Sequence, residues 1–149
     1  MTGKGLDLAL RFRKALDRTA AEQDRIERQR LRRAVEGRRA RTELFADLEA
    51  FGRAVGHLDV ERGPERLTMG WGEQRLVFEA VGDGDEVGVR LEGSEDAEPT
   101  PHRLYREPRL GDRWVLSLWR RGREERLTLF DSGLEALLVI ALELPGPED

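Results

Sequence analysis

The chain has 149 residues, about the size of one domain, and its 26 basic and 30 acidic residues give a net charge of −4 at pH 7. This balance does not mark the whole chain as a nucleic-acid binder. No apolar run approaches the roughly 18 residues that a membrane-spanning helix needs, so we expect no membrane association. Because cysteine is absent, disulfides, thiolate metal sites and cysteine nucleophiles are excluded. This fits a reducing compartment, and we expect a cytoplasmic protein.

Charge divides the chain into two parts. Residues 1–41 hold 13 basic and 6 acidic residues, net +7, whereas residues 42–149 hold 13 basic and 24 acidic residues, net −11. We expect a basic helical arm over residues 1–55 and an acidic antiparallel β domain with a C-terminal helix over residues 56–149.

The first part predicts one long helix. No proline interrupts residues 6–55, and most residues there are good helix formers. Asp7 precedes Arg11 by four residues, the favourable order for an ion pair on a helix. Gly37 costs about 1 kcal/mol relative to alanine in a helix, so we expect a hinge at this position.

Apolar residues at both ends of this helix follow the alternating three- and four-residue spacing of a packing seam. The N-terminal seam begins at Phe12 and Leu16 and turns polar before Ile26. The C-terminal seam consists of Leu44, Leu48, Phe51 and Val55. The β domain can cover only the nearer seam. We therefore expect the other to bury itself in an oligomer, as a coiled coil, or against another protein.

Between the seams, residues 25–41 contain eight arginines and two glutamates. One side of the helix carries Arg25, Arg28, Arg32 and Arg39. A helix that is polar nearly all round does not lie in a monomer core. Three interpretations remain open: contact with a protein surface, neutralisation of nucleic-acid phosphates, and a solvated helix whose arginines reflect genome composition. We favour protein contact because the run has no aromatic residue and the net −11 remainder would repel a phosphate backbone.

The second part predicts an antiparallel meander of five or six strands. Apolar residues alternate along most of the expected strands, which are residues 67–71, 76–81, 87–91, 102–106, 114–119 and 127–129. Gly82–Asp85 and Arg121-Gly122 are turn signals, and the short connections favour a meander over crossovers. We expect His102 to be an exposed loop residue at a strand entrance.

The end of the chain predicts an apolar helix. The segment Ser132–Glu135 matches a capping box, and Pro145 stops the element. Leucines and an alanine follow at helical spacing, at Leu134, Leu137, Leu138, Ala141 and Leu142. A strand over residues 136–144 is the alternative, because a short apolar run is ambiguous. Val139 and Ile140 make the far side apolar too, so we expect the N-terminal helix or a subunit contact to cover them.

The sequence offers little sign of catalytic chemistry. It contains no phosphate-binding glycine loop, no nucleophile elbow and no H-E-x-x-H pair. His57 and Asp59 make only half of a metal site, and neither His57 nor His102 has a serine partner at a recognisable spacing. We expect no catalytic residue, metal or cofactor, although a triad built from distant positions stays open.

The sequence therefore predicts an α+β fold with a long N-terminal helix, an antiparallel meander and a C-terminal apolar helix. We expect a non-catalytic interaction or assembly protein, an adaptor or chaperone-like subunit, whose arm contacts a protein partner or a second copy. The expected partner-binding residues are Arg25, Arg28, Arg32, Arg39, Leu44, Leu48, Phe51, Val139 and Ile140. The first alternative is a nucleic-acid-associated protein that clamps the phosphate backbone with the Arg25–Arg41 run. The second is a small enzyme.

Overall fold

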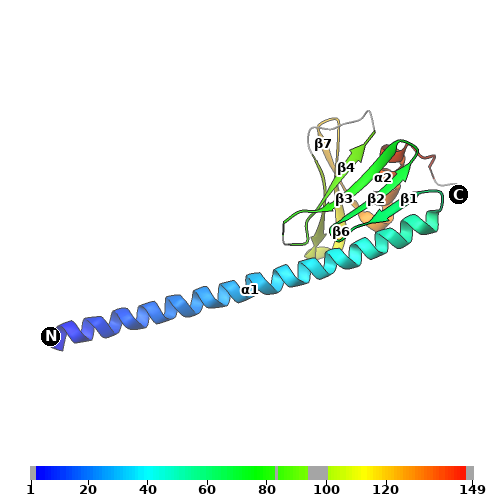
Figure 1. Cartoon of the computed structure of the whole chain (residues 1–149). Coiled ribbons are helices and arrows are strands. Elements are labelled where there is room, and N and C mark those ends of the chain that lie inside the picture. The colour runs from blue at the N-terminus through cyan, green and yellow to red at the C-terminus, as the bar shows by residue number, and fades with distance from the viewer. Residues whose placement is uncertain (1–2, 83, 94–100, 147–149) are drawn as a thin grey trace. The chain divides into compact units, whose positions relative to one another are not determined.

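The computed structural model describes residues 3–82, 84–93 and 101–146. They form one long N-terminal helix, a seven-stranded antiparallel sheet and a C-terminal helix (Figure 1). This confirms the α+β class, with seven strands where five or six were expected. The chain divides into two compact units, Met1–Val35 and Glu36–Asp149. The C-terminal end of the long helix therefore belongs to the same unit as the sheet.

Each strand of the sheet pairs antiparallel with its neighbour in the sequence, which is the expected meander. The strands are β1 Asp59–Arg62, β2 Arg66–Trp71, β3 Gln74–Ala80, β4 Val87–Glu92, β5 His102–Glu107, β6 Arg113–Arg120 and β7 Arg123–Thr128. Strand β1 was not expected, because its sequence has one apolar residue, Val60, and carries no alternating pattern. The Arg121-Gly122 turn joins β6 to β7 as expected. Position 83 of the expected Gly82–Asp85 turn lies outside the described residues.

The core lies on one face of the sheet, between the strands and the two helices. The strands contribute alternate residues, among them Leu67, Met69, Leu76, Phe78, Val87, Val89, Leu104, Leu116 and Leu118. The long helix α1 (Gly3–Val55) adds Leu44, Phe45 and Leu48. Burying one such side chain stabilises the fold by roughly 1.5–3 kcal/mol, so this stretch of α1 is held firmly to the sheet.

Helix α1 is continuous through Gly37, the position where we expected a hinge, and this glycine has a packing role. Gly37 is buried. A Cβ atom built on it would lie 2.8 Å from the amide nitrogen of Asp85 and 2.9 Å from the carbonyl carbon of Gly84. Both are backbone atoms of the β3–β4 connection, so only glycine permits so close an approach.

Arg41, one helical turn beyond Gly37, fastens α1 to the same connection. Its side chain is 5 % exposed. One terminal nitrogen, Nη1, donates hydrogen bonds to the carbonyl oxygens of Val81 (3.2 Å) and Gly82 (2.9 Å). The last arginine of the predicted contact run is therefore a structural anchor.

The C-terminal element is a helix, which excludes the alternative strand. A π-helical turn, η2 (Leu129–Gly133), leads directly into α2 (Leu134–Leu142), and a 3-10 turn, η1 (Pro108–Leu110), lies between β5 and β6. The capping-box prediction is wrong. The residue before α2, Gly133, has helical backbone angles and makes no side-chain cap, because the chain already winds through Ser132. The buried side of α2 matches the predicted one: Leu134, Leu137, Leu138, Ala141 and Leu142.

Candidate interaction surface

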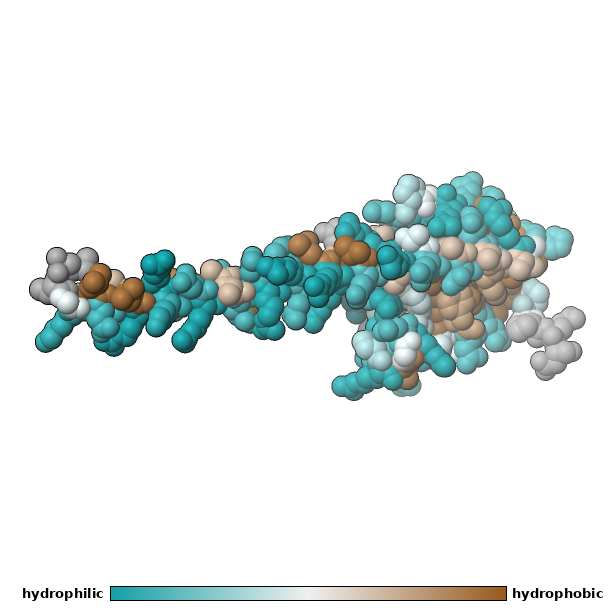
Figure 2. All heavy atoms as spheres, turned by 90° about the horizontal axis from the view of Figure 1, so that it is seen from below, coloured by the Kyte–Doolittle hydropathy of each residue, from teal (hydrophilic) through white to brown (hydrophobic). Residues whose placement is uncertain are grey.

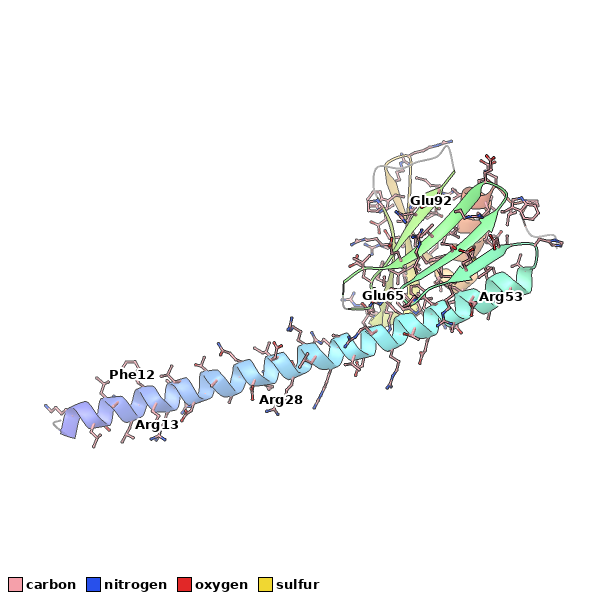
Figure 3. The ribbon with its side chains drawn as sticks, viewed as in Figure 1. Phe12, Arg13, Arg28, Arg53, Glu65 and Glu92 are labelled. Atoms are coloured by element: carbon pink, nitrogen blue, oxygen red, sulfur yellow. The ribbon has the colours of Figure 1, made fainter. Side chains whose placement is uncertain are left out.

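Apolar side chains of α1 between residues 3 and 35 are exposed to solvent. Each of the following is at least half exposed: Leu6, Leu8, Leu10, Phe12, Leu16, Ile26, Leu31 and Val35. Figure 2 shows such apolar side chains on the helix surface, separated by hydrophilic stretches. In Figure 3, Phe12 projects from a different side of α1 than Arg28. On the face shown in Figure 2, the apolar residues therefore form separate patches.

Three arginines of the run form ion pairs within the helix. Arg28 contacts Asp24 at 3.1 Å and Arg30 contacts Glu27 at 2.8 Å. Arg25 pairs with Glu22, and its hydrogen bond lowers the pKa of that carboxyl group. These pairs link neighbouring turns and support the exposed helix. They also neutralise Arg25 and Arg28, two of the four arginines expected to contact a partner.

The remaining exposed arginines of the run differ from these three. Within the described residues, no ion pair joins a carboxylate to Arg32, Arg33, Arg38 or Arg39. Glu36 lies among them in the sequence but pairs with none of the four. All four arginines are exposed. They supply the uncompensated positive charge of the run and include Arg32 and Arg39 of the predicted set.

Three of the four residues of the C-terminal seam of α1 face the chain's own sheet, whereas Val55 is 44 % exposed. Leu44 and Leu48 are fully buried in the core, and Phe51 is half-buried against it. The β domain thus covers the nearer seam, and these three residues are taken up by the fold itself. Phe45 was missed, because it lies outside the seam spacing although it is buried with the other two.

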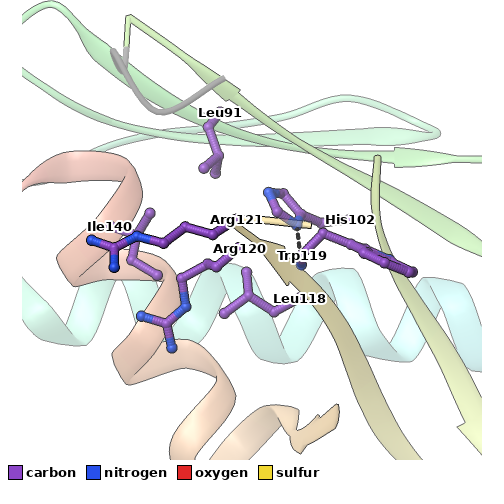
Figure 4. Close-up of a pocket in the computed structure, with 7 residues that line it drawn as sticks. All are labelled: Leu91, His102, Leu118, Trp119, Arg120, Arg121 and Ile140. Carbon is purple, nitrogen blue, oxygen red and sulfur yellow. Dashed lines mark hydrogen bonds between the residues drawn. The ribbon is translucent and has the colours of Figure 1, made fainter. Parts of the chain in front are cut away.

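Val139, on the far side of α2, is 39 % exposed, so the described residues do not cover it. Ile140 is half-buried. It lines a cavity of about 480 Å³ together with Leu91, His102, Leu118, Trp119, Arg120 and Arg121 (Figure 4). This cavity lies within the unit that contains the sheet, and no sequence pattern pointed to it.

His102 is buried, so the prediction of an exposed loop residue is wrong. The ladder between β5 and β6 ends at Arg103 and Ser117, and Trp119 lies beyond its last pair. The amide of Trp119 donates instead to Nδ1 of His102 at 2.9 Å. The imidazole thus replaces a backbone acceptor where the ladder stops, a role that no local sequence signal reveals.

The described residues contain neither a cluster of metal-ligand side chains nor a helix that could span a membrane. No group of three or more histidine, cysteine, aspartate or glutamate side chains there is placed to hold a metal ion. His57 is exposed, with a left-handed backbone (φ 63°) in the connection after α1. No described helix combines the length and apolar character that crossing a bilayer requires.

No protein-family model, curated protein or solved structure matches this chain.

Proposed function

We propose that this protein is a non-catalytic interaction or assembly protein, an adaptor or chaperone-like subunit, whose N-terminal helix contacts a protein partner. The observation that carries the proposal is the exposed surface of α1 over residues 3–35. It combines large apolar side chains with Arg32 and Arg33, which form no ion pair with any described carboxylate. Contact with a partner accounts for both features at once.

Burial of the apolar patches supplies the attraction. Each leucine or phenylalanine removed from water contributes roughly 1.5–3 kcal/mol before the cost of association. Four ion pairs link turns of this part of the helix, but such exposed pairs add little. Helices outside a fold are usually stabilised by packing an apolar face, which a partner would provide here.

The unpaired arginines define the chemistry of the partner surface. A surface with exposed carboxylates would neutralise Arg32, Arg33, Arg38 and Arg39, and their aliphatic stems would lie on apolar residues. A second copy of the chain offers such a surface, because residues 42–149 carry a net charge of −11. We therefore propose self-association as the first mode of contact.

Sedimentation velocity of the full chain at tens of micromolar (an order-of-magnitude concentration) tests this proposal. We expect an oligomer that weakens at high salt. Replacing Arg32 and Arg33 by glutamine should weaken it more than the same change at Arg25 and Arg28, which are already paired with Glu22 and Asp24. The two double variants remove equal charge, so they form a matched pair.

Binding of a fluorescent random-sequence oligonucleotide distinguishes the alternative. A chain that stays monomeric, binds the oligonucleotide, and loses affinity steeply with salt would instead be a nucleic-acid-associated protein. The last outcome is a monomeric chain in which both double variants sediment alike and bind the oligonucleotide alike. This result would show that the unpaired arginines contribute neither to self-association nor to nucleic-acid binding.

A further inference from the structure

One side of the exposed part of α1 carries an apolar seam with a polar middle. Phe12, Leu16 and Ile26 are each more than half exposed. Together with Thr19 and Gln23 they follow the alternating four- and three-residue spacing that keeps side chains on one side of a helix. The seam therefore has an apolar patch at each end and two polar residues at its centre.

Two copies of this seam match each other when they run in opposite directions. An antiparallel pairing centred at residue 21 places Leu16 of one copy opposite Ile26 of the second, and Thr19 opposite Gln23. The hydroxyl group of Thr19 donates to the carbonyl oxygen of Ala15 at 3.0 Å, and its oxygen can accept from the Gln23 amide. Coiled coils use a single polar layer to fix their register, so the polar middle of the seam specifies how the two helices align.

The ends of the seam also find suitable neighbours in this register. Phe12 lies opposite Arg30, and its ring can cover the aliphatic stem of that arginine. Arg30 keeps its ion pair with Glu27 at 2.8 Å, because the stem and not the charged head makes the contact. Arg33 lies opposite Ala9, whose small side chain leaves room for it.

The charges that flank the seam are complementary in the same register. Arg13 and Glu27 each follow a seam residue by one position, so they border the same edge of the seam. Antiparallel pairing places Arg13 of one copy beside Glu27 of the second, and two-fold symmetry repeats the contact. Among the described residues, Arg13 forms no ion pair with a carboxylate. Glu27 already pairs with Arg30, but a carboxylate accepts hydrogen bonds from more than one donor.

One contact in this register joins like charges. Glu22 lies beside Glu22 of the second copy at the two-fold axis. In each chain Arg25 pairs with this carboxylate. The two glutamates therefore meet as neutralised ion pairs, which reduces their repulsion.

A parallel, in-register pairing suits the same residues less well. It would place Arg30 on Arg30 and Arg33 on Arg33 within the seam, and Glu22 beside Glu27 at its edge. Contacts between like charges oppose association. The antiparallel register avoids both arginine contacts, since it moves each arginine to a neutral neighbour.

We infer that the N-terminal part of α1 pairs antiparallel with the same part of a second copy, with Leu16 against Ile26 and Arg13 beside Glu27. All of the paired residues belong to the unit Met1–Val35. This pairing rests on the proposed self-association. It specifies which side of the helix is buried and in which direction the two helices run.

Sedimentation velocity of full-length charge variants tests the pairing. Arg13→Glu and Glu27→Arg each turn two attractive contacts into repulsive ones, so we expect each to weaken self-association by about tenfold. The double variant restores both contacts with the charges exchanged and should recover association. An equimolar mixture of the two single variants should also associate more tightly than either variant alone.

The recovery is specific to an antiparallel pair. Residues 13 and 27 lie roughly 21 Å apart along one helix at 1.5 Å per residue, so they contact each other neither within a chain nor in a parallel, in-register pair. Lys14→Glu is the matched control, because it makes the same change of charge on the outer side of the helix. It should leave association unchanged within about twofold, and far-ultraviolet circular dichroism checks that every variant keeps the helix.

Spin labels measure the direction of the helices independently. The chain has no cysteine, so Lys14→Cys or Ala21→Cys carries one label, and both positions are exposed and point away from the seam. Antiparallel pairing centred at residue 21 makes the distance between the two labels longer at residue 14 than at residue 21. A parallel, in-register pair makes the two distances equal, and pulsed electron paramagnetic resonance distinguishes the two arrangements.

The failure of this pairing and the failure of self-association give different results. An oligomer with equal label distances, or one in which neither the double variant nor the mixture recovers association, would overturn the antiparallel pairing and leave self-association standing. A chain that remains monomeric at tens of micromolar (an order-of-magnitude concentration) would overturn both.

Discussion

At the scale of single residues, Gly37 and Arg41 determine how α1 meets the sheet. The glycine lets the helix approach the backbone of residues 84 and 85, and the arginine holds the carbonyl groups of residues 81 and 82. Both contacts lie on the β3–β4 connection and are one helical turn apart. These two contacts hold residues 37–41 of α1 against the β3–β4 connection.

We expect Gly37→Ala to lower the free energy of unfolding by up to about 2 kcal/mol. Alanine gains about 1 kcal/mol in helix propensity, but overpacking against backbone costs about 1–3 kcal/mol. Gly3→Ala is the control, since no atom outside the neighbouring helix backbone lies within 4 Å of a Cβ built there. Urea denaturation measures both, and a stabilised Gly37→Ala would show that the close approach is not strained.

Arg41→Met should cost about 1–3 kcal/mol, because it removes the hydrogen bonds to Val81 and Gly82 while keeping an apolar stem. Arg38→Met, three residues earlier on the exposed part of the helix, is the control and should change stability by less than about 0.5 kcal/mol. Equal midpoints of urea unfolding for the two variants would argue against an anchoring role for Arg41.

At the scale of elements, α2 has two unlike sides. Leu137 is fully buried and Val139 is 39 % exposed. Leu137→Ala should therefore destabilise the protein by about 2–5 kcal/mol. Val139→Glu should leave the midpoint of thermal unfolding nearly unchanged. If Val139→Glu unfolds the chain, the far side of α2 is internal. If it lowers the sedimentation coefficient of a folded oligomer, that side is a subunit contact.

The N-terminal part of α1 should respond to acid. The hydrogen bond from Arg25 lowers the folded-state pKa of Glu22, so this pair stabilises the helix above the ordinary glutamate pKa. The stabilisation is lost as the pH falls through the lowered value. Helical Cα chemical shifts near residues 20–27 should decline on acidification, and less so in Glu22→Gln. Glu36→Gln, which removes no ion pair seen here, should behave like the unaltered chain.

At the scale of the whole molecule, the sequence predicted those elements whose pattern is local. The proline-free helix, the alternating strands and the apolar C-terminal helix follow from residue spacing. The ion pairs of Arg25 and Arg30 could also be predicted from the sequence, since Glu22 and Glu27 precede these arginines by three residues. Strand β1 was missed because pairing with β2, and not its own composition, makes it a strand.

The features that the sequence did not reveal depend on contacts between distant residues. His102 is a buried hydrogen-bond acceptor because the amide of Trp119 lies beyond the last pair of the β5–β6 ladder. Gly37 has a packing role because another backbone lies against it. The cavity beside α2 brings together β4, β5, β6 and α2, which are distant in sequence. The residue spacing within a single helix or strand does not predict such contacts between distant elements.

The order of elements along the chain has a consequence for biosynthesis. The sheet lies between its two covering helices in the sequence, and α2 supplies Leu137 and Leu142 to the same core as β2 and β3. A growing polypeptide therefore completes the strands before it can close their apolar face. During that interval the outer strands β1 and β7 present mainly charged residues at the two edges of the sheet, which discourages nascent chains from pairing edge to edge.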